Sequence, residues 1–213
     1  MKIALIGGTG FVGSAVLQEL LQRGHEVTAL ARNPGKYTAH AKLKVVEADA
    51  LDAAQVAAAV EGHDAVIDSY NPGWSEPRIH DMFLEGTRAI VDGVKRSGVK
   101  RVLIVGGAGS LFVAPGVQLV DTPHFPAEYK QGALAAREAL NQIRAETALD
   151  WTFLSPAALL APGPRTGKFR IGADELLMDG DKPAGLSVAD LAVAIVDEIE
   201  TPKHIRKRFT AAY

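Results

Sequence analysis

The chain has 213 residues, of which 47% are hydrophobic, so it can bury one sizeable core and is too short for two ordinary domains. Its 23 Lys and Arg against 25 Asp and Glu leave a formal net charge of -2, which excludes the strong field that attracts nucleic acid or anionic lipid. The absence of cysteine excludes disulfide bonds and thiolate metal sites. The N-terminal apolar run meets glycines long before it reaches the length of a signal or membrane segment, so we expect a cytoplasmic protein.

Short apolar or β-branched runs alternate with helical patterns along the whole chain. The runs that predict strands are residues 3–6, 27–31, 43–46, 65–68, 102–105 and 151–154. Helical spacing occurs in Val12, Val16 and Leu20, in Ile79, Met82, Phe83, Gly86 and Ile90, and in Leu140 and Ile143. Ser187 and Asp190 predict a capping box at the start of a last helix, which carries Leu191, Ile195 and Ile199. A closing strand is expected over residues 209–212.

The alternation of strands and helices predicts an α/β fold with a parallel sheet. Continuously apolar strands indicate that helices cover both faces, and right-handed crossovers then favour a doubly wound sheet. We expect a single domain over residues 1–213. The stretch 156–172, rich in Pro and Gly, follows the sixth strand and breaks the alternation, so it is interpreted as a small substrate-side excursion.

The first predicted strand leads into a glycine-rich turn, and an amphipathic helix begins immediately after it. Gly7 permits a tight turn, Gly10 lets the backbone approach a pyrophosphate, and Gly13 lets the helix lie close to the strand. The free N–H groups at the helix start would then hold the phosphates. Strand, turn and helix together predict a Rossmann fold whose turn binds a nicotinamide dinucleotide through Gly7, Thr9, Gly10, Phe11, Val12 and Gly13.

The end of the second strand bears on the choice between NAD and NADP. An acidic residue there would bind the ribose 2′-hydroxyl of NAD, but the sequence reads Leu30-Ala31-Arg32-Asn33. The planar guanidinium of Arg32 suits a 2′-phosphate, although it could also be a solvated side chain at a strand end. The sequence therefore favours NADP and leaves NAD open.

Four further segments complete a family pattern: residues 47–50 (EADA), 69–72 (SYNP), 106–110 (GGAGS) and 155–163. With the glycine turn, they resemble the atypical short-chain dehydrogenase/reductases, specifically the NAD(P)H-binding proteins similar to NADH-flavin reductases and biliverdin-IXβ reductase. The resemblance covers essentially the whole chain. It implies adenine contacts from Asp49 and the backbone of Ala50, ribose and phosphate contacts from Ser69 and Tyr70, and an approach of Pro156 and Ala157 to the nicotinamide.

The sequence lacks the acid that this superfamily normally uses, a tyrosine followed four residues later by a lysine. Tyr129 is followed directly by Lys130, and adjacent helical residues do not share a face. Tyr129 is a candidate proton donor or a tyrosine that caps the core near Phe125. Ser110 is a candidate substrate contact or a cap for the segment that follows the glycines.

Hydride transfer to a flavin, quinone or bilin needs chiefly stacking and orientation. The missing pair therefore favours an NAD(P)H-dependent reductase of a small planar acceptor. Each of four aromatic residues in predicted loops could be a packing residue, but together they are consistent with an apolar cleft: Tyr70, Trp74, Phe112 and Phe125. Two other hypotheses stay open, a regulator that binds NADP without turning it over and, with less support, an epimerase or dehydratase relative. The sequence predicts no metal site, and it leaves the oligomeric state open.

Overall fold

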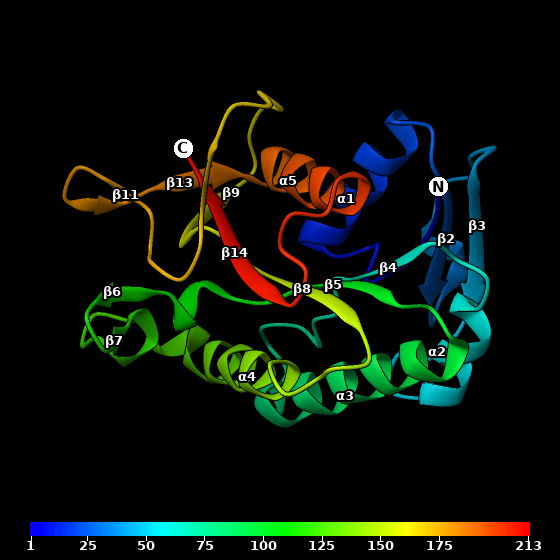
Figure 1. Cartoon of the computed structure of the whole chain (residues 1–213), viewed down its shortest axis with the longest axis horizontal. Coiled ribbons are helices and arrows are strands. Elements are labelled where there is room, and N and C mark those ends of the chain that lie inside the picture. The colour runs from blue at the N-terminus through cyan, green and yellow to red at the C-terminus, as the bar shows by residue number, and fades with distance from the viewer.

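The computed structural model describes residues 1–213 and contains a central eight-stranded sheet between two layers of helices (Figure 1). Its strands, from edge to edge, are β10 (Arg170–Gly172), β14 (Lys207–Ala212), β8 (Asp150–Ser155), β5 (Arg101–Val105), β4 (Ala65–Asp68), β1 (Lys2–Ile6), β2 (Glu26–Ala31) and β3 (Leu43–Glu47). Every neighbouring pair is parallel except β10 with β14. The predicted doubly wound α/β sheet is confirmed.

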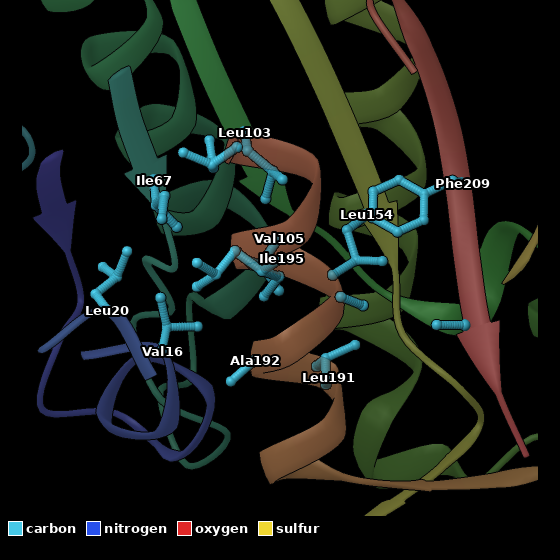
Figure 2. Close-up of a cluster of buried hydrophobic side chains, with 14 of the residues drawn as sticks. Val16, Leu20, Ile67, Leu103, Val105, Leu154, Leu191, Ala192, Ile195 and Phe209 are labelled. Carbon is cyan, nitrogen blue, oxygen red and sulfur yellow. The ribbon is translucent and has the colours of Figure 1, made fainter. Parts of the chain in front are cut away.

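Helices cover both faces of this sheet (Figure 1). The first layer consists of α1 (Phe11–Gln22) and α5 (Val188–Glu200), and the second of α2 (Ala53–Val60), α3 (Ile79–Ser97) and α4 (Ala127–Ile143). Alternate strand residues point into the two layers, which is why the central strands are apolar at almost every position. Figure 2 shows the first core, where Val16 and Leu20 of α1 face Leu191 and Ile195 of α5 across Ile67 of β4. None of the helices has the length and apolar content that crossing a membrane requires.

Two regions depart from the simple alternation. The first follows β5 and holds the short hairpin β6 (Phe112–Ala114) and β7 (Val117–Gln118), with 3-10 turns at Ala108–Ser110 and Leu119–Asp121. The second follows β8 as predicted, but it extends to residue 187 rather than 172. It contains β9 (Leu159–Ala161), which pairs with β13 (Gly185–Ser187), and the hairpin β11 (Met178–Asp179) and β12 (Lys182–Pro183). A bridge between Phe112 and Glu175 joins the two regions.

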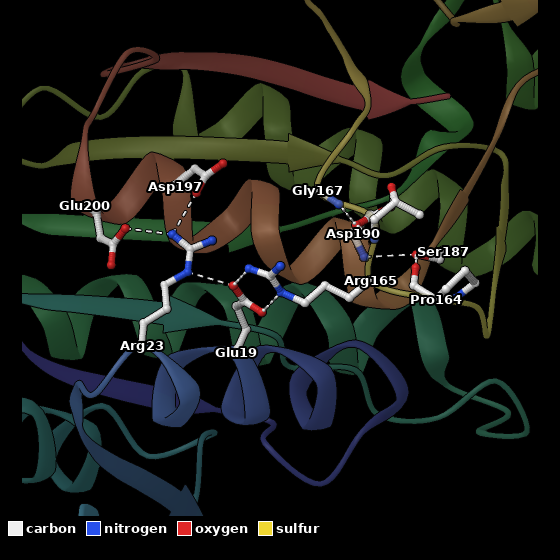
Figure 3. Close-up of polar contacts among 10 residues, drawn as sticks. Glu19, Arg23, Pro164, Arg165, Gly167, Ser187, Asp190, Asp197 and Glu200 are labelled. Carbon is white, nitrogen blue, oxygen red and sulfur yellow. Dashed lines mark hydrogen bonds and ion pairs between the residues drawn. The ribbon is translucent and has the colours of Figure 1, made fainter.

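The predicted capping box at the start of α5 is only half correct. The Oγ of Ser187 accepts a hydrogen bond from the Asp190 N–H at 3.0 Å, as a helix cap does. The fully buried carboxylate of Asp190 does not return to Ser187 but accepts from the hydroxyl and N–H of Thr166 and from the Gly167 N–H, the last visible in Figure 3. It also accepts from the Tyr213 hydroxyl. Burial raises the pKa of Asp190, but these donors outweigh it and leave the pKa below its ordinary value. Asp190 thus fastens the excursion to α5.

A buried carboxylate on α1 fastens the same excursion from the other side. Glu19 accepts two hydrogen bonds from Arg165, at 2.7 and 2.8 Å, and a third from Arg23 at 2.7 Å (Figure 3). Arg23 also pairs with Asp197 and Glu200 of α5. The excursion is therefore held against the helix that begins at the glycine turn.

Candidate dinucleotide site

The crevice of the sheet lies between the carboxyl ends of β1 and β4. From β1 the chain crosses to β2 on one side and later returns to β4 on the other, so these two strands mark the topological switch point. Gly7 follows β1 with φ +77, and a Cβ on it would lie 2.3 Å from the Ser69 carbonyl oxygen. Both the backbone angle and the available space therefore require glycine at position 7.

The glycine turn leaves the N-terminus of α1 open. A Cβ on Gly13 would lie 2.1 Å from the Gly7 carbonyl oxygen, so the helix and the turn are in direct contact. Gly10 is the N-cap, and its carbonyl accepts the first helical hydrogen bond from the Ser14 N–H at 2.9 Å. The helix has no side-chain cap and no acidic residue in its first turn. The preceding N–H groups, which include those of Phe11 and Val12, are available to the phosphates of a dinucleotide, so the site fits the cofactor.

The residues predicted to hold the adenosine half lie beyond β2 and β3. Arg32 is exposed, and its guanidinium has no hydrogen-bond or ion-pair partner in the chain. One carboxylate oxygen of Asp49 accepts from the Leu51 N–H at 3.0 Å, and the other has no partner. Burial raises the pKa of Tyr70, Arg32 lowers it, and Asp49 raises it. Both charges therefore act on one phenol beside the glycine turn, and Ala50 is half-buried next to Asp49.

Sequence reasoning missed Tyr37 at this end of the site. Asn33 caps the 3-10 turn Pro34–Lys36 through its side chain, which directs the chain back toward the glycines. A Cβ on Gly8 would lie 2.8 Å from the Tyr37 hydroxyl, so this side chain covers the turn. Burial raises the pKa of Tyr37 and keeps the phenol neutral. No local pattern signals the contact, because it joins residues from two separate strand ends.

The two residues predicted beside the ribose and phosphates follow β4. The Ser69 N–H donates to the Ile6 carbonyl at 3.0 Å, which extends the pairing with β1 to the edge of the crevice. The ring of Tyr70 lies on α3 at Gly86, where a Cβ would be 2.2 Å from it, and its hydroxyl donates to the Met82 carbonyl at 3.3 Å. Tyr70 is therefore anchored to α3 and only half exposed.

A buried carboxyl, Asp68, ends β4 at the same crevice and was also missed. Its side chain accepts from the Tyr70 N–H at 2.9 Å, and only 2% of the residue is exposed. Burial raises the pKa of Asp68 to about 7, and the single hydrogen bond lowers it only in part. A charged residue that ends an apolar run is a signal that the sequence offers, although it does not reveal the burial.

The two candidate catalytic residues lie in very different environments. Ser110 is buried, and its Oγ accepts from Nη1 of Arg208 at 2.9 Å rather than capping a backbone N–H. Arg208 itself is buried on β14 and also donates to Asp174. Tyr129 lies in the first turn of α4 and is 45% exposed, and its ring packs edge to face on Trp74. Its hydroxyl has no hydrogen-bond partner in the chain.

The pair predicted to approach the nicotinamide follows β8. Pro156 is half-buried, and Ala157 is buried in the core between the sheet and the layer of α1 and α5. Both follow the carboxyl end of β8, the neighbour of β5, and contact with a nicotinamide stays a prediction.

Comparison with known proteins shows the family of the chain and several similar proteins. The profile of the NAD(P)H-binding family matches residues 7–200. The YwnB protein of Bacillus subtilis is 38% identical over 213 residues, which cover 99% of this chain and 97% of that protein. The structure of a candidate epimerase from Bacteroides thetaiotaomicron is 46% identical in sequence, with a TM-score of 0.93. The match covers 100% of this chain and 96% of the epimerase chain. The structure of a candidate NADH-flavin reductase from Streptococcus pneumoniae is 30% identical in sequence, with a TM-score of 0.84. The match covers 100% of this chain and 99% of the reductase chain.

Replacement of Gly10 by valine tests the turn. Gly10 has extended backbone angles (φ -77, ψ 173), which valine adopts readily, so the Gly10→Val variant should fold. Its branched side chain would occupy the space in front of the open helix N-terminus, and we expect dinucleotide binding to be lost in calorimetry. Thermal unfolding of the same sample controls for the fold. Unchanged affinity in a folded variant would remove this turn as the cofactor site.

The Asp68→Asn variant tests the buried carboxyl. The ordinary pKa of the group is 3.8 and its folded value about 7, so the folded chain retains a proton that the unfolded chain releases. The wild type is therefore most stable below the unfolded pKa and loses this contribution as the pH rises to about 7. Asparagine keeps the acceptor for the Tyr70 N–H without a charge.

We expect the stability difference between Asp68→Asn and the wild type to shift in favour of the variant by about 2 to 3 kcal/mol between about pH 5 and about pH 8. Urea unfolding over this range measures it. If the free energies of unfolding of the variant and the wild type changed in parallel with pH, Asp68 would be ionised in the folded chain.

Proposed function

The chain belongs to the NAD(P)H-binding family, and we propose that it is an NADPH-dependent reductase that passes a hydride to a small planar acceptor, such as a flavin, a quinone or a bilin-like molecule. The observation that carries the proposal is an open dinucleotide turn in a site without a paired tyrosine and lysine. A bound reduced nicotinamide would supply the hydride, and the protein would supply binding and orientation.

Binding would be divided along the crevice. The N–H groups at the start of α1, with Thr9 exposed beside them, would hold the pyrophosphate, and Ser69 and Tyr70 would flank the ribose and phosphates. Asp49 and the backbone of Ala50 would contact the adenine. The unpartnered guanidinium of Arg32 would pair with the 2′-phosphate, which supports NADP over NAD.

The proton that accompanies the hydride has more than one source. The exposed hydroxyl of Tyr129 can donate it, although the adjacent Lys130 does not share its helix face. Ser110 uses a lone pair to accept from Arg208, which leaves its O–H free to donate. Water also reaches this end of the site beside Tyr129. Reduction of a flavin or quinone does not require a proton donor of matched acidity, so any of these donors would suffice.

A second function is favoured by one observation. Because Ser110 is engaged by a buried arginine, Tyr129 has no lysine partner and Asp68 is almost fully buried, none of these groups is both exposed and tuned as an acid, as expected of a regulator that binds NADP without turnover. The absence of such an acid also counts against an epimerase or dehydratase.

Steady-state NADPH oxidation against a panel of flavins, quinones and bilins, with cofactor binding measured on the same sample, decides between reductase and regulator. Turnover of any member supports the reductase. Binding without turnover of any member would select the regulator.

The preference for NADPH is tested at Arg32. A charge-assisted hydrogen bond to the 2′-phosphate contributes about 1.5 to 3 kcal/mol, so Arg32→Ala should weaken NADPH binding about ten- to a hundredfold and leave NADH binding almost unchanged. Lys36→Ala, which removes a second exposed cation nearby, is the matched control and should have a much smaller effect. Equal losses for both cofactors in Arg32→Ala would show that Arg32 contacts the adenine or supports the fold.

The role of the hydroxyls is tested by Tyr129→Phe and Ser110→Ala. If the acceptor is a flavin or quinone, each variant should lower turnover by less than about a hundredfold, the lower end of general acid catalysis. Turnover on the best acceptor is measured together with cofactor affinity, which separates binding from chemistry. A loss above about ten-thousandfold at intact affinity would identify an essential proton donor or substrate anchor.

A further inference from the structure

We propose that Trp74, braced by Tyr129, is the stacking platform that selects a planar aromatic acceptor with two or more fused rings. This inference rests on the proposed reductase function and adds the residue that would determine its specificity. The two rings form an edge-to-face pair with centroids 5.1 Å apart and an interplanar angle of 81°. The two rings are therefore nearly perpendicular, and we call the angle between Trp74 and Tyr129 the aromatic corner.

The exposure of the indole is unusual for this chain. Trp74 is 55% exposed, whereas the other tryptophan, Trp151, is 2% exposed and donates its indole N–H to the Glu146 carbonyl. Exposing a large aromatic face to water forfeits the free energy that its burial would provide. An acceptor ring stacked on Trp74 would recover it.

The indole is held in place before any ligand arrives. The Asn71 side chain accepts from the Gly73 N–H at 2.7 Å, and the Gly73 carbonyl accepts from the Glu76 N–H at 3.1 Å, so Trp74 lies inside a closed turn. On the other side the ring rests on α4 at Gly132, where a Cβ would lie 2.7 Å from it. A preorganised ring loses little conformational entropy when a ligand stacks on it.

The position of the pair matches the reacting end of a dinucleotide. Trp74 follows β4, and the first half of α4, which carries Tyr129, packs on the glycine segment after β5, with Ala133 at Gly109. The aromatic corner therefore lies at the carboxyl ends of β4 and β5. Arg32 lies after β2, on the other side of the switch point. A dinucleotide whose adenosine half lies near Arg32 extends its nicotinamide toward the aromatic corner.

The other aromatic residues predicted for the cleft are less available. The ring of Tyr70 is anchored on α3, and Phe112 and Phe125 are half-buried in their loops. Trp74 thus offers the largest exposed aromatic surface of the four, which is why the proposal falls on it.

The test is binding of riboflavin to the protein saturated with oxidised NADP. Riboflavin has no phosphate to compete for the helix N-terminus, and the oxidised cofactor prevents turnover. In the wild type we expect saturable binding, followed by calorimetry, and quenching of flavin emission by contact with the indole. Trp74→Leu, which keeps apolar bulk but removes the ring, should weaken binding about tenfold or more and abolish that quenching.

Two further variants keep the result interpretable. Gly132→Ala retains the indole and favours the helix, but its methyl group displaces the ring, so it should weaken riboflavin binding while NADP affinity is unchanged. Ile171→Ala removes apolar surface of similar exposure from β10 at the sheet edge and should bind riboflavin like the wild type.

The outcomes separate the platform from the reductase. Riboflavin binding that is absent in the wild type, or equal in the wild type, Trp74→Leu and Gly132→Ala, would overturn the platform, even if NADPH oxidation is observed. Binding that depends on Trp74 without NADPH oxidation on any acceptor would support the platform and refute the reductase.

Discussion

The contact between the glycine turn and the segment after β4 determines the rest of the site. At Gly7 the backbone passes so close to the Ser69 carbonyl that no side chain fits, and at Gly13 the helix meets the carbonyl of the turn with the same closeness. These two contacts fix α1 against the crevice between β1 and β4. Because no side chain caps α1, its partial positive charge is directed at the place where the strand order reverses.

The substrate side is coupled to the same helix by buried charge. Glu19 is almost fully buried on α1, and the hydrogen bonds of Arg165 lower its pKa against the effect of burial. If Arg165 left, this buried carboxylate would keep only Arg23 as a charged partner, so separation of the excursion from α1 would cost stability. Asp190 fastens the next two residues, Thr166 and Gly167, to α5. The excursion is therefore tied by polar contacts to both α1 and α5 (Figure 3).

The parts of the fold that depend on local pattern could be predicted from the sequence. The first six predicted strands agree with the structure to within a residue at each end, because their apolar runs record burial on both faces, and the closing strand begins two residues earlier than predicted. The helix α2 was missed, since its alanine-rich stretch has only Val56 and Val60 to mark a face. Tyr37 and the partners of Asp190 could not be predicted, because their contacts join segments far apart in the sequence. The sequence marks Asp68 only as a charge at the end of an apolar run and does not reveal its burial.

The chemistry of the site follows from what lies on each side of the switch point. On one side are the groups that can recognise a phosphorylated adenosine, with Arg32 free of any partner. On the other, the exposed ring of Trp74 follows β4 and packs edge to face on Tyr129, whose hydroxyl has no partner in the chain. A site built this way can select a substrate by shape and stacking far better than it can transfer a proton. Orientation of a planar ring against the nicotinamide is therefore the property on which a reductase of this design would depend.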